Sequence, residues 1–233
     1  MSDAVLTDDG SYTLDSQRYG QTYHSTFGAL TEARHVFLDA TEVSDRLARG
    51  LATRVLEIGF GLGLNALLTA DLAVQHATQL DYHSFELELV NADVIQTLGY
   101  DSLLSHPALV DPLLDMIRQA HPAASGASDL LSCHHFQLNE QVSISLHLGD
   151  ATLVDFNNRC GDPFQAIYLD AFSPDTNAEC WSPEFIGALA AVLAEGGKLS
   201  TYSAKGSVRR AMLAAGLHVS KHPGPPGKRE MLV

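Results

Sequence analysis

Three glycines at alternate positions follow a short apolar run near residue 55. The stretch reads EIGFGLGLN over residues 57–65 and places Gly59, Gly61 and Gly63 directly after Glu57. Glycine lets a backbone turn tightly and approach a ligand where a Cβ atom would clash. We therefore expect this stretch to be a loop that binds a nucleotide-containing cofactor.

The spacing of these glycines excludes a dinucleotide fingerprint. That fingerprint needs the pattern G-x-G-x-x-G, whose third glycine lets a helix pack closely on a strand. Counted from Gly59, the third position is Leu64. The spacing after an acidic residue instead resembles the E/D-x-G-x-G-x-G loop of class I S-adenosylmethionine-dependent methyltransferases. The resemblance implies cofactor contacts from the following residues: Glu57, Gly59, Phe60, Gly61, Gly63 and Asn65.

Further acidic residues lie at or just after the ends of predicted strands, at positions suited to the same cofactor. Glu86 comes 23 residues after Gly63, and an acid about 20 residues beyond a glycine loop can bind ribose hydroxyls. Glu88 points to the same face of that strand and is the alternative if the register shifts. Asp150 follows the strand SISLHL and resembles the acid that binds the adenine amino group. It could also be a helix N-cap, and the two roles are compatible.

Asp170 is the candidate catalytic residue. It leaves a buried strand in the stretch YLDAFSP, at the carboxyl edge of the predicted sheet, where ligands of open α/β folds bind. There it would stand near the transferable methyl group of the cofactor, with a structural N-cap as the alternative. Phe172 and Trp181 could stack on a flat acceptor or pack in the core. Tyr202 ends a later strand and is expected to line the same pocket.

The elements that position these residues alternate between strand and helix from residue 54 onward. This alternation predicts a doubly wound, mostly parallel α/β sheet of the Rossmann-like type. We expect one domain over residues 1–233, with 1–50 as an N-terminal extension and 90–130 as a helical insertion. The insertion is expected to be interrupted at Pro107, Pro112 and Pro122 and to end in the loop 123–128.

The hydrophobic periodicity and turn residues predict the individual elements. They are a hairpin at 10–20 around Asp15-Ser16, a helix at 28–40, a hairpin at 133–148, strands at 55–58, 80–87, 165–169 and 198–202, helices from 64, at 183–194 and at 208–215, and closing strands at 217–220 and 230–233. The helix at 183–194 is expected to end at Gly196-Gly197.

The composition, 45% hydrophobic and 18% charged residues, is typical of a soluble globular protein. The sequence contains no stretch of about 18 apolar residues, so we expect no membrane span. The polar, acidic N-terminus does not resemble a signal peptide. The cysteines at 133, 160 and 180 are far apart, which favours reduced thiols in a cytoplasmic protein without a zinc site. His134 and His135 face opposite sides of a strand and are not expected to bind a metal.

The charge is unevenly distributed along the chain. The net charge is −14, yet residues 198–233 hold seven lysines and arginines against the single acid Glu230, and no lysine precedes Lys198. The basic residues could cluster at one end by chance. Alternatively, they form a basic surface beside the active site that faces a phosphate backbone.

In order along the chain, several stretches resemble the methyltransferase module of the MnmC family and its free-standing MnmD relatives. They are GQTYHSTFGALTEARHVFL, EIGFGLGLN, SFELE, LHLGDA, YLDAFSPDTNAECW and GKREML. The resemblance implies methylation of the aminomethyl group on the wobble uridine of tRNA. We expect this chain to be of the free-standing type, without the flavin-dependent oxidase module of two-domain members. The aminomethyl substrate is therefore expected to come from another enzyme.

The resemblance also implies roles for individual residues. Asp170 would hydrogen-bond the acceptor amine and take its proton, close to Phe172, Pro174, Trp181 and Tyr202. Phosphates of the anticodon arm would be bound without base readout by Lys205, Arg209, Arg210, Lys228 and Arg229.

Two other classes of function remain open from the sequence. One is a methyltransferase that acts on a small metabolite or a protein amine, which the acidic bulk of the chain would suit. The other is a module that binds the cofactor without catalysis. Salt-sensitive binding of tRNA favours the RNA enzyme, whereas cofactor binding without transfer to any RNA favours the binding module.

Overall fold

The computed structural model describes residues 4–121 and 132–233, which contain a six-stranded sheet with the order β6-β7-β5-β4-β8-β9. Its strands are β4 (Thr53–Ile58), β5 (Leu80–Glu86), β6 (Ser132–Gln137), β7 (Val142–Leu148), β8 (Phe164–Leu169) and β9 (Leu193–Ser200). Neighbouring strands are parallel except for the antiparallel pair β6 and β7. The predicted mostly parallel α/β sheet is confirmed.

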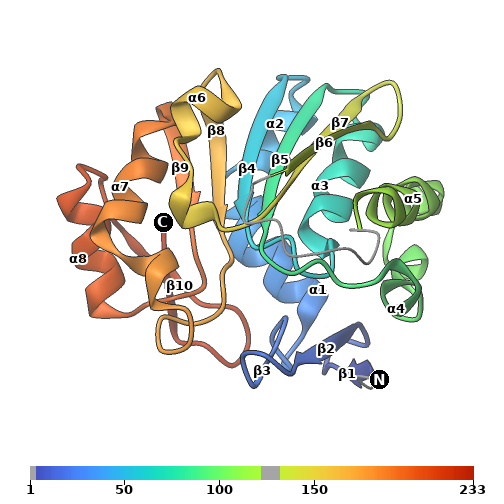
Figure 1. The fold of residues 1–233 in the computed structure, drawn as a ribbon, viewed down its shortest axis with the longest axis horizontal. Helices are drawn as coiled ribbons and strands as arrows, with labels where there is room; N and C mark the ends of the chain where they lie inside the picture. The colour runs from blue at the N-terminus through green and yellow to red at the C-terminus, as the bar shows by residue number, and fades with distance from the viewer. Residues whose placement is uncertain (1–3, 122–131) are drawn as a thin grey trace.

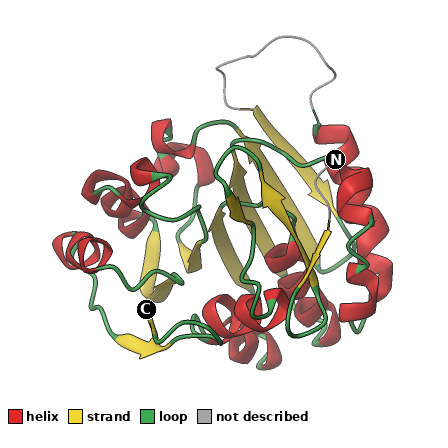
Figure 2. Ribbon diagram, turned by 90° about the horizontal axis from the view of Figure 1, so that it is seen from below, coloured by secondary structure: helices red, strands yellow, loops and turns green. Residues whose placement is uncertain are grey.

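Helices cover both faces of this sheet (Figures 1 and 2). One face is covered by α2 (Val43–Ala48), α3 (Leu64–Gln75) and α5 (Val110–Ala120), and the other by α6 (Phe156–Cys160), α7 (Pro183–Ala191) and α8 (Gly206–Ala214). Successive strand residues enter different cores, as Val55 and Leu56 do, because side chains alternate across a sheet. No helix among the described residues is long and apolar enough to cross a membrane.

A small antiparallel sheet precedes the main one and lies below it in Figure 1. It consists of β1 (Ala4–Leu6), β2 (Tyr12–Ser16) and β3 (Gln21–Thr22). The predicted turn at Asp15-Ser16 was wrong, because these residues pair with β3. The chain reverses at residues 17–20, where Gly20 adopts a φ of 61° that other residues rarely take.

The helix expected at 28–40 is present as two successive segments of different helix type. The short α1 (Ala29–Glu32) continues into a π-helix at Ala33–Asp39. π-Helical turns are rare in proteins, and those that occur are often found at functional sites. Glu32 stands at the junction of the two.

The insertion after β5 contains α4 (Ala92–Gln96), 3₁₀ turns at Tyr100–Leu103 and Pro107–Leu109, and α5. Pro112 does not interrupt it, contrary to expectation. It lies in the first turn of α5, where a helix needs no backbone N–H donor. Pro122 and the loop 123–128 lie outside the described residues.

Two C-terminal boundaries differ from expectation. Helix α7 ends at Ala191, and Gly196 and Gly197 lie inside β9. A Cβ atom on Gly197 would lie 3.0 Å from the carbonyl oxygen of Phe164, so the glycines serve the close, irregular pairing of β8 and β9. The first closing strand is not 217–220, because Leu217 bonds back to Met212 at the end of α8. The closing pair is β10 (Lys221–Pro223) and β11 (Glu230–Leu232).

Candidate functional site

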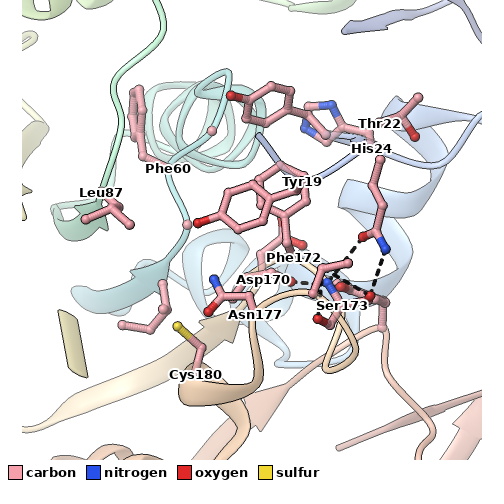
Figure 3. Close-up of a pocket in the computed structure, with 18 of the residues that line it drawn as sticks. Tyr19, Thr22, His24, Phe60, Leu87, Asp170, Phe172, Ser173, Asn177 and Cys180 are labelled. Atoms are coloured by element: carbon pink, nitrogen blue, oxygen red, sulfur yellow. Dashed lines mark hydrogen bonds between the residues drawn. The ribbon is translucent and has the colours of Figure 1, made fainter. Parts of the chain in front are cut away.

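A cleft of about 880 Å³ opens at the carboxyl ends of β4, β5, β7 and β8. Its wall contains the predicted residues Gly59, Phe60, Gly61, Glu86, Asp150, Asp170, Phe172, Tyr202 and Lys228. Its opposite wall comes from the N-terminal segment 18–27, and Glu32 also lines it. Figure 3 shows several of these side chains around one space. The volume is within the range of small-molecule binding sites.

The glycine loop packs the end of β4 against the end of β8. A Cβ atom on Gly59 would lie 2.6 Å from the carbonyl oxygen of Asp170, so this position excludes any larger residue. Gly59 and Gly61 line the cleft with bare backbone. Gly63 is the left-handed N-cap of α3, with a φ of 77°, and it does not line the cleft. The expected cofactor contact of Gly63 stays a prediction.

Glu57 and Asn65 lie behind the cleft rather than in its wall. The fully buried Glu57 carboxylate accepts hydrogen bonds from Ser84 Oγ at 2.7 Å and Asn65 Nδ2 at 3.0 Å. Burial raises the pKa of Glu57 to about 7. Asn65 Nδ2 also donates to Asp170 Oδ2 at 2.8 Å. Asn65 therefore binds the Asp170 carboxylate from behind the cleft, and Glu57 binds Asn65 in turn.

Glu86 and Asp150 lie in the cleft wall at the ends of adjacent strands. Glu86 accepts backbone N–H groups from Gly61 and Glu88, both at 2.8 Å. Glu88, the alternative acid, is exposed and pairs with Arg18 at 3.4 Å. Asp150 accepts the N–H of Thr152 at 2.9 Å and caps a 3₁₀ turn, so its capping role coexists with a place in the wall.

Asp170 faces the cleft from the end of β8 and is half-buried. Burial, followed by the carboxylates of Glu32 and Glu57, raises the pKa of Asp170 well above the ordinary aspartate value. Lys228 acts in the opposite direction. A carboxylate with a raised pKa is a stronger proton acceptor, as general-base chemistry near neutral pH requires.

Aromatic rings from two distant segments form one wall of the cleft. Phe172 stacks on Tyr19 with ring centroids 4.2 Å apart and meets Tyr23 edge-on at 5.2 Å, and Figure 3 shows the Tyr19 and Phe172 rings next to each other. Tyr202 donates its hydroxyl to the Ala171 carbonyl at 2.8 Å. Phe172 and Tyr202 therefore both lie where an acceptor could bind.

Trp181 belongs to the core rather than to the cleft wall. It is 5% exposed, and its Nε1 donates to the carbonyl oxygen of Phe172 at 2.8 Å. Core packing, the alternative left open from the sequence, therefore accounts for Trp181. Pro174 is half-buried in the same loop and does not line the cleft.

Sequence reasoning missed the wall that the N-terminal segment provides. Tyr19, Tyr23, His24 and Glu32 all line the cleft. Gln21 Nε2 donates to Ser173 Oγ at 2.8 Å and joins this segment to the loop after Asp170. The segment has no acid at a strand end to mark it. Its density of polar and aromatic residues in QRYGQTYHS was the available signal.

The basic residues near the C-terminus are less available than their number suggests. All four lysines pair with acids: Lys198 with Glu42, Lys205 with Asp175, Lys221 with Glu230, and Lys228 with Glu32. Lys228 points into the cleft rather than outward. Arg209, Arg210 and Arg229 are exposed. No ion pair joins these three arginines to an acid within residues 4–121 and 132–233.

A buried cluster was not expected from the sequence. The ligand-type atoms of His83, His147 and Cys160 lie within 4.8 Å of one another. The two imidazoles bond each other at 3.2 Å, and His83 Nε2 lies 3.4 Å from Asp81. Burial lowers the pKa of His147 to about 3, which keeps it neutral.

Comparison with known proteins identifies several relatives. The family model described as S-adenosyl-L-methionine-dependent methyltransferase matches residues 115–233. The bifunctional protein MnmC for tRNA 5-methylaminomethyl-2-thiouridine biosynthesis is 31% identical in Burkholderia thailandensis and 32% identical in Burkholderia mallei. Each alignment covers 98% of this chain. The chain spans about a third of their length, 34% in each case.

The fold also resembles a solved structure. The crystal structure of MNMC2 from Aquifex aeolicus superimposes with a TM-score of 0.74 at 25% identity. The match covers 100% of this chain and 69% of that one. It therefore includes the N-terminal segment and the C-terminal turn that line the cleft.

Proposed function

We propose that this chain, which belongs to the MnmC methyltransferase-domain family of S-adenosyl-L-methionine-dependent methyltransferases, N-methylates the 5-aminomethyl group of (2-thio)uridine at the tRNA wobble position. The observation that carries the proposal is the place of Asp170. Its carboxylate faces the same cleft as the glycine loop and Glu86, and aromatic rings border it. The similarity to MnmC proteins supports the choice of tRNA.

The residues of the cleft fit the family's cofactor. Gly59 and Gly61 leave bare backbone along the wall, and a Cβ atom on Gly59 would collide with the Asp170 carbonyl. Glu86 brings a carboxylate to the end of β5, where it could accept from two ribose hydroxyls. We propose that Asp150 contacts the adenine. Phe60 and Leu87 line the same part of the cleft.

The proposed chemistry needs an aligned and unprotonated amine. When bound, S-adenosylmethionine supplies an electrophilic methyl group whose C–S bond breaks as the new N–C bond forms. A primary alkylamine is mostly protonated at neutral pH and has no lone pair to attack with. Asp170 accepts one amine proton, and Asn65 holds the carboxylate in position at 2.8 Å. General-base catalysis of this kind contributes about 10²–10⁴-fold.

Orientation comes from the remaining walls. The Tyr19–Phe172 stack presents aromatic surface from the N-terminal segment and the Asp170 loop. A flat base can stack on such surface, which contributes about 1–3 kcal/mol per base in single-stranded recognition. We propose that the N-terminal segment and the sheet act as one catalytic unit, because both line the cleft.

The test is nucleoside analysis of tRNA from a strain that lacks this protein. We expect 5-aminomethyl-2-thiouridine to accumulate at the expense of its methylated form, and the wild-type gene but not an Asp170→Asn variant to restore it. Purified protein and cofactor should methylate that tRNA in vitro. An unchanged nucleoside profile, together with methylation of a free metabolite or a protein amine, would replace the RNA substrate.

A further inference from the structure

We propose that Glu32 and the ring of Tyr202, beside Asp170, form a binding subsite for a primary alkylammonium group, which the ammonium of Lys228 fills in this structure. The inference rests on the proposed function, since an aminomethyl acceptor would bring such a group to the cleft. Glu32 and Lys228 come from segments 196 positions apart, and both line the cleft.

The contacts of Lys228 show how the subsite holds a cation. Lys228 Nζ lies 2.6 Å from Glu32 Oε1 and 3.9 Å from the centroid of the Tyr202 ring. A cation within about 6 Å of an aromatic centroid is attracted to the ring face. The second oxygen of Glu32 accepts the N–H of Ser25 at 2.7 Å. The carboxylate is thus fixed before any ligand arrives.

The protein's own ammonium and the substrate's are chemically alike. Both carry one positive charge and three N–H donors on a flexible alkyl carbon. A site that satisfies Lys228 with a carboxylate and an aromatic face therefore satisfies an aminomethyl group in the same way. A hydroxymethyl group of similar size lacks the charge.

The burial of Glu32 explains why the subsite needs a cation. The Glu32 side chain is 8% exposed, and a buried carboxylate without a partner is strongly unfavourable. Lys228 provides that partner while the substrate is away. Asp170 forms no ion pair within residues 4–121 and 132–233, and its carboxylate accepts a hydrogen bond from the neutral amide of Asn65. The cleft therefore keeps a second carboxylate, that of Asp170, beside the subsite.

Lys228 can leave the subsite without disturbing the sheet. Its side chain is 34% exposed, and it belongs to the turn between β10 and β11, closed by its N–H bond to Pro225 at 2.9 Å. Its flexible four-carbon stem can swing outward. The arriving ammonium then takes Glu32 and the Tyr202 face, in the same cleft as the Asp170 carboxylate.

The alternative is that the Lys228–Glu32 pair only fastens the C-terminal turn to the N-terminal segment. The two views differ when Lys228 is removed. If Glu32 serves Lys228 alone, Glu32→Gln has no further effect on ligand binding in a Lys228→Met background. If Glu32 also receives the ligand, the effect of Glu32→Gln persists in that background.

The test titrates the folded protein with ethylammonium and follows binding by NMR. Lys228→Met should bind ethylammonium about tenfold more tightly than the wild type, on the scale of coupling between contacting groups. Adding Glu32→Gln should remove the gain. Tetramethylammonium, which has no N–H donor for Glu32, should show a smaller gain. Lys221→Met is the matched control, because it breaks a Lys–Glu pair of the same 2.6 Å length outside the cleft.

Equal ethylammonium affinity in the wild type and Lys228→Met would overturn the subsite. If Glu32→Gln fails to fold, Tyr202→Leu in the Lys228→Met background serves instead, and an undiminished affinity there would also overturn it. The measurement uses no RNA and so separates the two proposals. Ethylammonium binding as expected, with no tRNA methylated, would overturn the RNA substrate and leave the subsite standing.

Discussion

Glu86 Oε2 accepts the backbone N–H of Gly61 at 2.8 Å, so the acid that ends β5 holds the glycine loop that follows β4. Glu86→Ala should weaken S-adenosylmethionine binding at least about tenfold in calorimetry, because ribose hydroxyls lose a charged acceptor. Glu88→Ala is the control and should bind normally, since Glu88 is exposed and pairs with Arg18. Equal affinities for the two variants would remove Glu86 from the cofactor site.

Asp170→Asn separates catalysis from binding. The amide keeps the size of the side chain but cannot take a proton, so turnover should fall by about 10²-fold or more. Cofactor affinity should stay within a few-fold in calorimetry. Asp175→Asn changes an exposed acid of the same loop, paired with Lys205, and should methylate normally. Wild-type turnover by Asp170→Asn at pH 7 would exclude the base role.

The pH profile should report the surroundings of Asp170. In the proposed mechanism the ionised carboxylate is the active form, so kcat/KM should fall as the pH falls through the pKa of Asp170, which burial, Glu32 and Glu57 raise. Glu32→Gln removes a negative charge, so the acid limb should move to lower pH. Lys228→Met removes a positive charge and should move it to higher pH. Identical limbs in all three proteins would assign the limb to another group.

Glu57 should make stability depend on pH. Its pKa rises from 4.5 to about 7 on burial, so the folded state binds more protons between these values and stability declines as the pH rises through this window. At about 1.4 kcal/mol per unit, ionising Glu57 costs about 3 kcal/mol. Urea unfolding should show Glu57→Gln gaining stability relative to the wild type from pH 5 to pH 8. A constant difference across this range would contradict the raised pKa.

The exposed arginines of α8 are the best candidates for RNA contact. Arg209→Ala combined with Arg210→Ala should reduce the salt dependence of tRNA binding by about one to two units of slope, since each phosphate contact contributes roughly 0.7–0.9. Lys198→Ala combined with Lys221→Ala is the control, because both lysines already pair with acids. An unchanged slope in the folded arginine variant would exclude α8 from the RNA interface.

The elements that carry Glu86 and Asp170 could be predicted from local patterns. Glu86 ends β5 and Asp170 follows β8, and parallel strands bring their carboxyl ends to one edge. Glu57 was predicted to contact the cofactor, but this prediction did not take into account that side chains alternate across a strand. Glu57 lies next to the apolar Leu56 and Ile58 within β4, and its side chain enters the packed interior beside Ser84.

The other half of the cleft depends on contacts between distant residues. Nothing local to Tyr19 or Glu32 indicates that their partners are Phe172 and Lys228. The number of basic residues near the C-terminus likewise did not indicate which of them form ion pairs with acidic residues. Only the fold brings Glu32 to Lys228 and Asp175 to Lys205.

The hydrogen bond between Gln21 and Ser173 joins residues 152 positions apart. During synthesis it can form only after the chain has been extended to Ser173. Residues around Gln21 leave the ribosome well before their partners exist, and contacts between such distant residues form slowly because a long loop must close. The aromatic side chains of the nascent N-terminal segment are therefore expected to stay exposed until residues 172–173 have been synthesised. We expect the cleft to be the last part of the molecule to assemble, after the central strands have paired.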